Sequence, residues 1–167
     1  MLANPPVGIL SWIVFLPLVG AGLLYLLPVF KAHKDLHGKL ARAFAFLITI
    51  LAFVLSLWML LKFDSQQSDY QFVEHAVWIP QFGISYHLGV DGLSVFLVLL
   101  TTFLMPLVVM ASTSVHKKVR GYLFNMLLLE TAMLGTLLAL DLFLFYVFWE
   151  LMLAPMYFII GIWGGKR

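Results

Sequence analysis

Long apolar runs separated by short polar segments dominate this sequence. Residues 7–30 carry no charge, nineteen uncharged residues lie between Arg42 and Lys62, and a third apolar run extends from Gly92 to Val115. A helix rises about 1.5 Å per residue, so roughly 20 apolar residues cross the hydrocarbon layer of a bilayer. Each of these runs is therefore predicted to be a membrane-spanning helix, the first of them a retained helix and not a cleaved signal.

The last apolar stretch, residues 121–165, is long enough to cross twice. It contains three charged residues, Glu130, Asp141 and Glu150, and corresponds to about 67 Å of helix. Asp141 lies near its midpoint and is predicted to be the turn. The fold class expected is an all-α polytopic membrane protein with five transmembrane helices.

One polar segment has a different pattern. Residues 84–91 alternate strictly between apolar and polar, residues 73–79 are also β-prone, and Pro80–Gly83 is a turn signal. A short β-hairpin between the second and third helices is predicted, with Asp91 as the N-cap of the third helix.

Composition and charge agree with a membrane protein. The 167 residues are 63% hydrophobic and 11% charged, against about 25% charged in soluble domains. Nine of the ten Lys and Arg fall in residues 31–42, residues 116–120 and the C-terminal Lys166–Arg167, and Lys62 is the tenth. The positive-inside rule then places these three segments in the cytoplasm and both the N-terminus and the hairpin outside. A net charge of +2 in short loops indicates topology and does not predict nucleic-acid binding.

The candidate functional residues are Glu150 and Glu130. If helices four and five turn at Asp141, both carboxyl groups lie near the bilayer midplane, about 14–16 Å from the outer end. A charge there is costly, and desolvation favours the protonated form, so each group could load and release a proton. The structural alternative is that each glutamate makes a fixed interhelical hydrogen bond or a salt bridge to another subunit. The case for a functional role over this alternative is stronger for Glu150 than for Glu130.

The surroundings of Glu150 favour a functional role. Tyr146, Ala154 and Tyr157 share its helical face and could form a polar seam against a neighbouring helix. Pro155 should bend the helix just beyond it. There is no cysteine, no phosphate loop and no dinucleotide fingerprint. We therefore expect no metal, cofactor or redox site within this chain.

Three stretches resemble a known family: LGVDGLSVFLVLLTTFLMPLVVMAS at 88–112, the 127–165 run containing FWELMLAPMYF and GIWGG, and the predicted hairpin before them. They are similar to the antiporter-like, proton-translocating membrane subunit of NADH:quinone oxidoreductase (respiratory complex I), subunit 4 or chain M type. The resemblance implies that Glu150 pairs with a lysine on a seventh helix, and, less firmly, that Glu130 matches a fourth-helix carboxylate. It also implies that NADH, FMN, iron–sulfur clusters and quinone are bound by partner subunits.

On this interpretation, residues 1–62 hold two helices with a basic cytoplasmic loop, residues 63–91 the external hairpin, and residues 92–167 three helices that start the antiporter-like module. The sequence reaches only the fifth helix, so the lysine would belong to a missing remainder: a fragment is the simplest explanation and a split gene the second. The expected partners are other membrane-arm subunits and the lipid bilayer, in a bacterial inner (plasma) membrane. The alternatives are a Mrp-type cation/proton antiporter or membrane-bound hydrogenase subunit, or a purely structural anchor.

Overall fold

The computed structural model describes residues 8–26 and 34–165 and contains the five predicted helices. In chain order these are α1 (Ile9–Leu26), α2 (Lys34–Lys62), α3 (Ser94–Ala111), α4 (Val119–Leu138) and α5 (Leu142–Trp163). All five are long and apolar enough to cross a membrane. The turn between α4 and α5 falls at Asp141, as predicted.

Two helix boundaries differ from the prediction. The segment 34–42 was expected to be a loop, but α2 already begins at Lys34. This segment contains Lys, Leu, Ala and Arg, all good helix formers, so the helix continues beyond its apolar span. The second difference is at the end of α3, because the third apolar run was predicted to extend to Val115. Helix α3 ends at Ala111 and is followed by one 3₁₀ turn, η3 (Ser112–Ser114). Residues 27–30 of the first apolar run lie outside the described residues.

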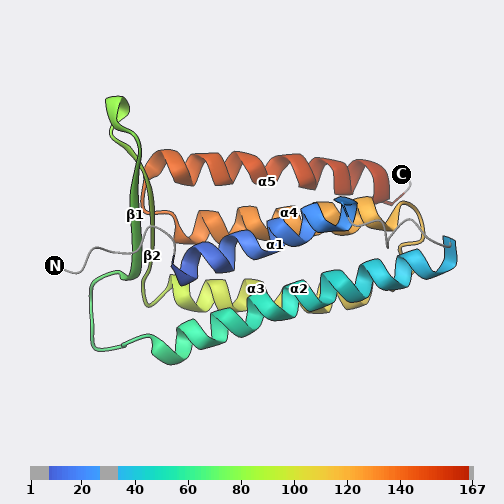
Figure 1. The fold of residues 1–167 in the computed structure, drawn as a ribbon, viewed down its shortest axis with the longest axis horizontal. Helices are drawn as coiled ribbons and strands as arrows, with labels where there is room; N and C mark the ends of the chain where they lie inside the picture. Colours follow the sequence, from blue (N-terminus) through green and yellow to red (C-terminus); the bar gives the residue numbers. More distant parts are fainter. Residues whose placement is uncertain (1–7, 27–33, 166–167) are drawn as a thin grey trace.

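The helices form a bundle in which α4 has a central place (Figure 1). It packs against α1, α2, α3 and α5, whereas α5 lies along one side and packs mainly against α4. The apolar core has two parts. One lies at the hairpin end, where all five helices and the second strand of the hairpin contribute to it, and the other lies among α1, α2, α3 and α4 near the opposite end.

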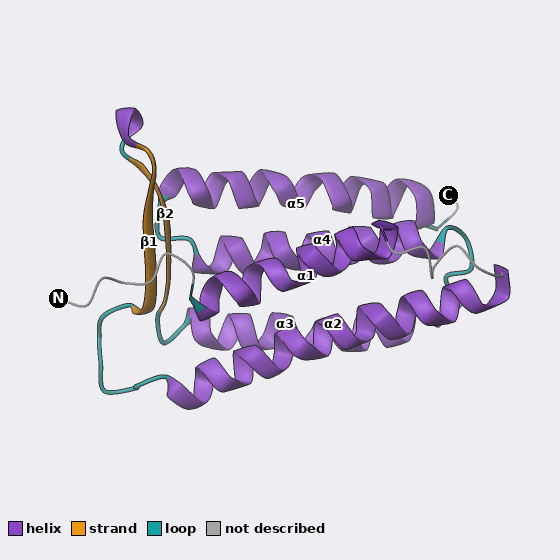
Figure 2. Cartoon of the chain, viewed as in Figure 1, coloured by secondary structure: helices purple, strands orange, loops and turns teal. Residues whose placement is uncertain are grey.

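The predicted hairpin is present and stands across one end of the bundle (Figure 2). Strands β1 (Gln71–Ile79) and β2 (Ile84–Val90) are antiparallel, and a 3₁₀ turn, η2 (Pro80–Phe82), joins them. Gly83 follows with φ of 67°, a left-handed conformation in which a side chain would be strained. After β2, the Asp91 carboxylate accepts hydrogen bonds from the N–H groups of Leu93 and Ser94, so it caps the entry to α3 as predicted.

Candidate functional site

Glu130 lies in α4 at the centre of the bundle and is fully buried. Leu123, Leu127 and Leu134, on the same side of α4, are also 0% exposed. Neither of its carboxylate oxygens has a hydrogen-bond partner among the described residues, and the hydroxyl of the adjacent, buried Thr131 also lacks one. The structure therefore places a carboxyl group in apolar surroundings, without a compensating donor or cation among residues 8–26 and 34–165.

The burial of Glu130 without a partner among the described residues affects its protonation state. An ionised carboxylate without partners in a low-dielectric interior carries a large desolvation penalty, so the neutral acid is favoured. Buried polar groups in proteins are nearly always satisfied, and the exceptions call for an explanation such as a catalytic role. Glu130 is such an exception, and it is a group able to hold one proton at the centre of the bundle.

Glu150 has a contrasting position, on the exposed side of α5. Leu144, Phe148 and Pro155 form the buried side of this helix. Tyr146, one turn before Glu150, interacts with it through its hydroxyl. Within the described residues, Glu150 therefore lies on an outer face of the bundle and not in its core.

Glu130 and Glu150 are at matching depth on neighbouring antiparallel helices, as the sequence indicated. Each lies eight residues from the helix end that adjoins the Asp141 turn, which corresponds to about 12 Å along the axis. The two helices approach closely at Gly135, where an added Cβ would lie 2.3 Å from the Phe148 ring. The two carboxyl groups nevertheless do not hydrogen-bond to each other, because Glu130 has no partner.

The residues predicted to form a polar seam lie exposed on α5, on a face that points away from the rest of the described chain. Tyr146 is 56% exposed and Tyr157 is 74% exposed, and Ala154 is exposed as well. No described helix packs against this face. Pro155 is buried, and α5 continues through it as one helix.

A second buried carboxylate, Glu74 of β1, was not among the candidate residues that the sequence indicated. It is 1% exposed. Its Oε1 accepts hydrogen bonds from the backbone N–H groups of Leu10 (2.7 Å) and Ser11 (3.1 Å), and its Oε2 accepts one from the Ser11 hydroxyl. An acid at this helix N-terminus satisfies free N–H groups and complements the helix dipole. The available signal was that α1 follows Gly8, a residue with no capping side chain.

The Glu74 contact extends to the second strand. The Ser11 hydroxyl also hydrogen-bonds the Tyr86 hydroxyl, and burial raises the pKa of Tyr86. Gly8 permits this arrangement, because an added Cβ there would lie 2.7 Å from the Glu74 carboxylate. The hairpin is thereby fixed to the start of α1.

Asp141 attaches the hairpin to α5. Its Oδ1 caps α5 by accepting from the N–H groups of Phe143 and Leu144, and its Oδ2 accepts from the N–H and hydroxyl of Ser85. The hydrogen bond from the Ser85 backbone, followed by those from the α5 N–H groups, lowers the pKa of Asp141. The hairpin thus connects the ends of the first and last helices.

The fold and these residues define a polytopic membrane protein with an unpaired acid in its central helix. The family model described as NADH-ubiquinone oxidoreductase chain 4, amino terminus, matches residues 21–145. The chain belongs to this family.

Relatives from bacteria agree with this assignment. NADH-quinone oxidoreductase subunit M of Rhodobacter capsulatus is 44% identical over 96% of this chain, and that of Rickettsia prowazekii is 39% identical over 95%. The matched regions cover 30% and 32% of those proteins. The chain thus spans about a third of the length of the curated relatives it matches.

Solved structures show the same arrangement of helices. A chain of respiratory complex I from Thermus thermophilus with bound NADH matches with a TM-score of 0.75 and 29% identity, over 95% of this chain and 30% of that one. A chain of the archaeal membrane-bound sulfane sulfur reductase shares the fold, with a TM-score of 0.68. Together with the five apolar helices, the bacterial relatives support an integral, multi-pass protein of the plasma membrane.

Proposed function

We propose that this chain is the N-terminal part of a proton-translocating membrane-arm subunit of NADH:quinone oxidoreductase. The family match and the relatives' names support the assignment. The structural observation that carries it is Glu130, a fully buried carboxyl group in the central helix of an apolar bundle, which has no hydrogen-bond partner in the part of the chain that the structure describes. Ionisable groups inside membranes are expensive and mark proton relays by default.

Glu130 acts as the internal proton carrier in this proposal. In its apolar surroundings the carboxyl group retains its proton. An approaching positive charge, or water entering beside it, stabilises the ionised form and lets the proton leave. Interactions of this kind are strong at low dielectric, so a small movement of a neighbouring group is enough to change the protonation state.

Glu150 acts at the surface that the rest of the subunit covers. Its exposed position on α5 leaves it accessible to groups beyond the described residues, and the family resemblance implies a lysine from a later helix as its partner. Approach of that lysine favours the carboxylate, and its withdrawal favours the protonated acid. The pair thereby couples a movement of charge along the membrane to proton release at Glu150.

The redox chemistry belongs to other subunits in this proposal. NADH, FMN, the iron–sulfur clusters and quinone bind elsewhere in the complex, and neighbouring membrane-arm subunits are the direct partners. The orientation follows from charge. The end of the bundle that holds residues 116–120 and the C-terminal end of α5 faces the cytoplasm, and the hairpin end faces outward (Figure 1).

The test is proton pumping by the complete complex carrying Glu130→Gln or Glu150→Gln, reconstituted in sealed vesicles. Proton uptake and NADH:quinone reduction are measured together, with Asp69→Asn in the exposed loop before β1 as a matched control. Each glutamate variant is expected to lose most of its proton pumping, because the group that accepts and releases the proton is removed. The control is expected to pump normally.

An unchanged ratio of protons to electrons in both glutamate variants would contradict the proposal and support the structural-anchor alternative. That alternative also predicts that Glu150→Leu damages assembly while Glu150→Gln does not. Replacing the sodium in the assay by potassium separates the antiporter alternative, because only a sodium-coupled subunit would then lose transport.

A further inference from the structure

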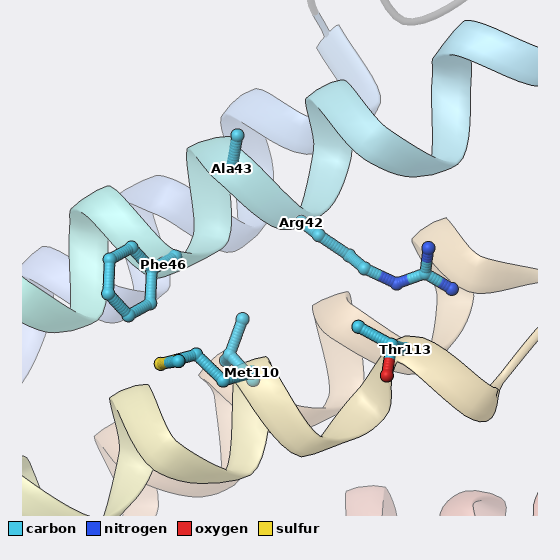
Figure 3. Close-up of a pocket in the computed structure, with 6 residues that line it drawn as sticks. Arg42, Ala43, Phe46, Met110 and Thr113 are labelled. Carbon is cyan, nitrogen blue, oxygen red and sulfur yellow. The ribbon is translucent and has the colours of Figure 1, made fainter.

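A groove opens on the surface between α2 and α3 at the end of the bundle opposite the hairpin (Figure 3). It has a volume of about 160 Å³ and is lined by six residues: Arg42, Ala43, Phe46, Val109, Met110 and Thr113. Its polar and apolar residues are separated along its length. Arg42 and Thr113 lie toward one end, whereas Phe46 and Met110 lie toward the other.

The polar end of the groove lies where the two helices reach the membrane boundary. The apolar spans run from Gly38 to Lys62 in α2 and from Ser94 to Ser114 in the α3 region, so Arg42 and Thr113 are within about one turn of the ends of their spans. Phe46 and Met110 lie about one turn deeper. A phospholipid has the same division, with its phosphate at the boundary and its acyl chain toward the bilayer centre.

Charge at this end of the bundle favours an anion. Arg42 donates a hydrogen bond to the backbone carbonyl of Val115, a neutral group, and its Nε–H has no acceptor among the described residues. Lys117, Lys118 and Arg120 follow within a few residues of this carbonyl. A phosphate suits a guanidinium well, because two N–H groups can donate to it at once.

We propose that this groove binds one anionic phospholipid, with its phosphate on Arg42 and its acyl chain along Ala43, Phe46 and Met110. Basic pockets between transmembrane helices at the cytoplasmic side are suited to such headgroups. A soluble phosphate compound would leave the apolar part of the groove uncovered, whereas a phospholipid covers both parts. The inference does not depend on proton transfer at Glu130 or Glu150.

The experiment identifies the occupant by photo-crosslinking in the complete complex. A benzoylphenylalanine replaces Thr113, and the purified complex is reconstituted in vesicles containing either radiolabelled phosphatidylglycerol or radiolabelled phosphatidylcholine in an unlabelled bilayer. The subunit is expected to be labelled several-fold more by the anionic lipid. A crosslink to another protein subunit instead of lipid would overturn the proposal.

Three substitutions and one control, each made in the protein that carries the crosslinker, distinguish binding of the headgroup from binding of the acyl chain. Arg42→Gln is expected to reduce phosphatidylglycerol labelling about tenfold, the effect of losing a charge-assisted pair, and Arg42→Lys should retain most of it. Ala43→Phe fills the groove and should reduce labelling by both lipids. Lys62→Gln makes the same change of charge at an exposed site at the hairpin end of α2, far from the groove, and should change labelling less than about twofold.

Equal labelling of wild type and Arg42→Gln by phosphatidylglycerol would overturn the proposal. If Arg42→Gln prevents assembly because its bond to Val115 is structural, Arg42→Lys and Ala43→Phe still decide the question. Retained labelling in Ala43→Phe would also overturn it, because the acyl chain would then lie elsewhere.

Discussion

Helices α4 and α5 are neighbouring antiparallel membrane helices, and each carries a glutamate at the same depth. The two helices nevertheless differ in how much of their surface is buried. In α4 nine residues are buried, whereas in the longer α5 only three are. Glu130 is consequently enclosed by protein, and Glu150 lies on an outer face. In the proposed function the two glutamates therefore have different roles. Glu130 is an internal proton carrier, and Glu150 contacts the rest of the subunit.

The largest difference in stability between α4 and α5 is expected when one glycine in each helix is replaced by alanine. Gly135→Ala should lower the free energy of unfolding by about 2–3 kcal/mol, because the new methyl group overlaps the Phe148 ring and separates α4 from α5. Gly161→Ala is the matched control on α5, where nothing lies within 4 Å of an added Cβ. It should change stability by less than about 0.5 kcal/mol or raise it slightly. Thermal unfolding in detergent micelles measures both variants.

A smaller effect is expected from removing each carboxyl group. Glu130→Leu should raise the free energy of unfolding by about 1–3 kcal/mol, because a buried acid without partners is replaced by an apolar side chain. Glu150→Leu should change the stability of this chain by less than about 0.5 kcal/mol, since the site is exposed here. Destabilisation by Glu130→Leu would show that Glu130 has a hydrogen-bond partner in the membrane.

The junction between the two helices gives a third test. Asp141→Ala removes the N-cap of α5 and the acceptor for Ser85, and should cost about 1–2 kcal/mol. Ser85→Ala removes only the hydroxyl donor to Asp141 and should cost less, about 0.5–1 kcal/mol. Equal losses in the two variants would mean that the cap on α5 contributes little.

The smallest effect expected is a dependence on pH. The pKa of Asp141 is lowered by its hydrogen bonds, so its contribution to stability is complete above its unfolded value near 4 and is lost as the pH falls through the lower folded value. Asp141→Asn retains a capping oxygen but does not titrate. The difference in melting temperature between wild type and this variant should therefore shrink between pH 5 and pH 3. A constant difference over this range would contradict the role of the ionised carboxylate.

Much of the fold was predictable because membrane helices follow local rules. The apolar runs, the Asp141 turn and the alternation at residues 84–90 are properties of neighbouring residues, and the structure confirms the elements they predict. The start of α2 at Lys34 was not predicted, because the apolar run begins only after Arg42. The part of the helix beyond the membrane depends on propensity and on its surroundings, which the hydrophobic pattern does not record.

The sequence by itself determined that two acids lie at the same depth in the last two helices. Their depth follows from residue count and helical rise. Only the tertiary structure decided that Glu130 is enclosed and Glu150 is exposed, because the rotation of each helix depends on packing at contacts such as Gly135 against Phe148. It also decided that Glu74 caps α1, a contact between residues 64 positions apart. Every side of these helices is apolar, so hydrophobicity alone does not indicate which side faces the protein and which faces lipid.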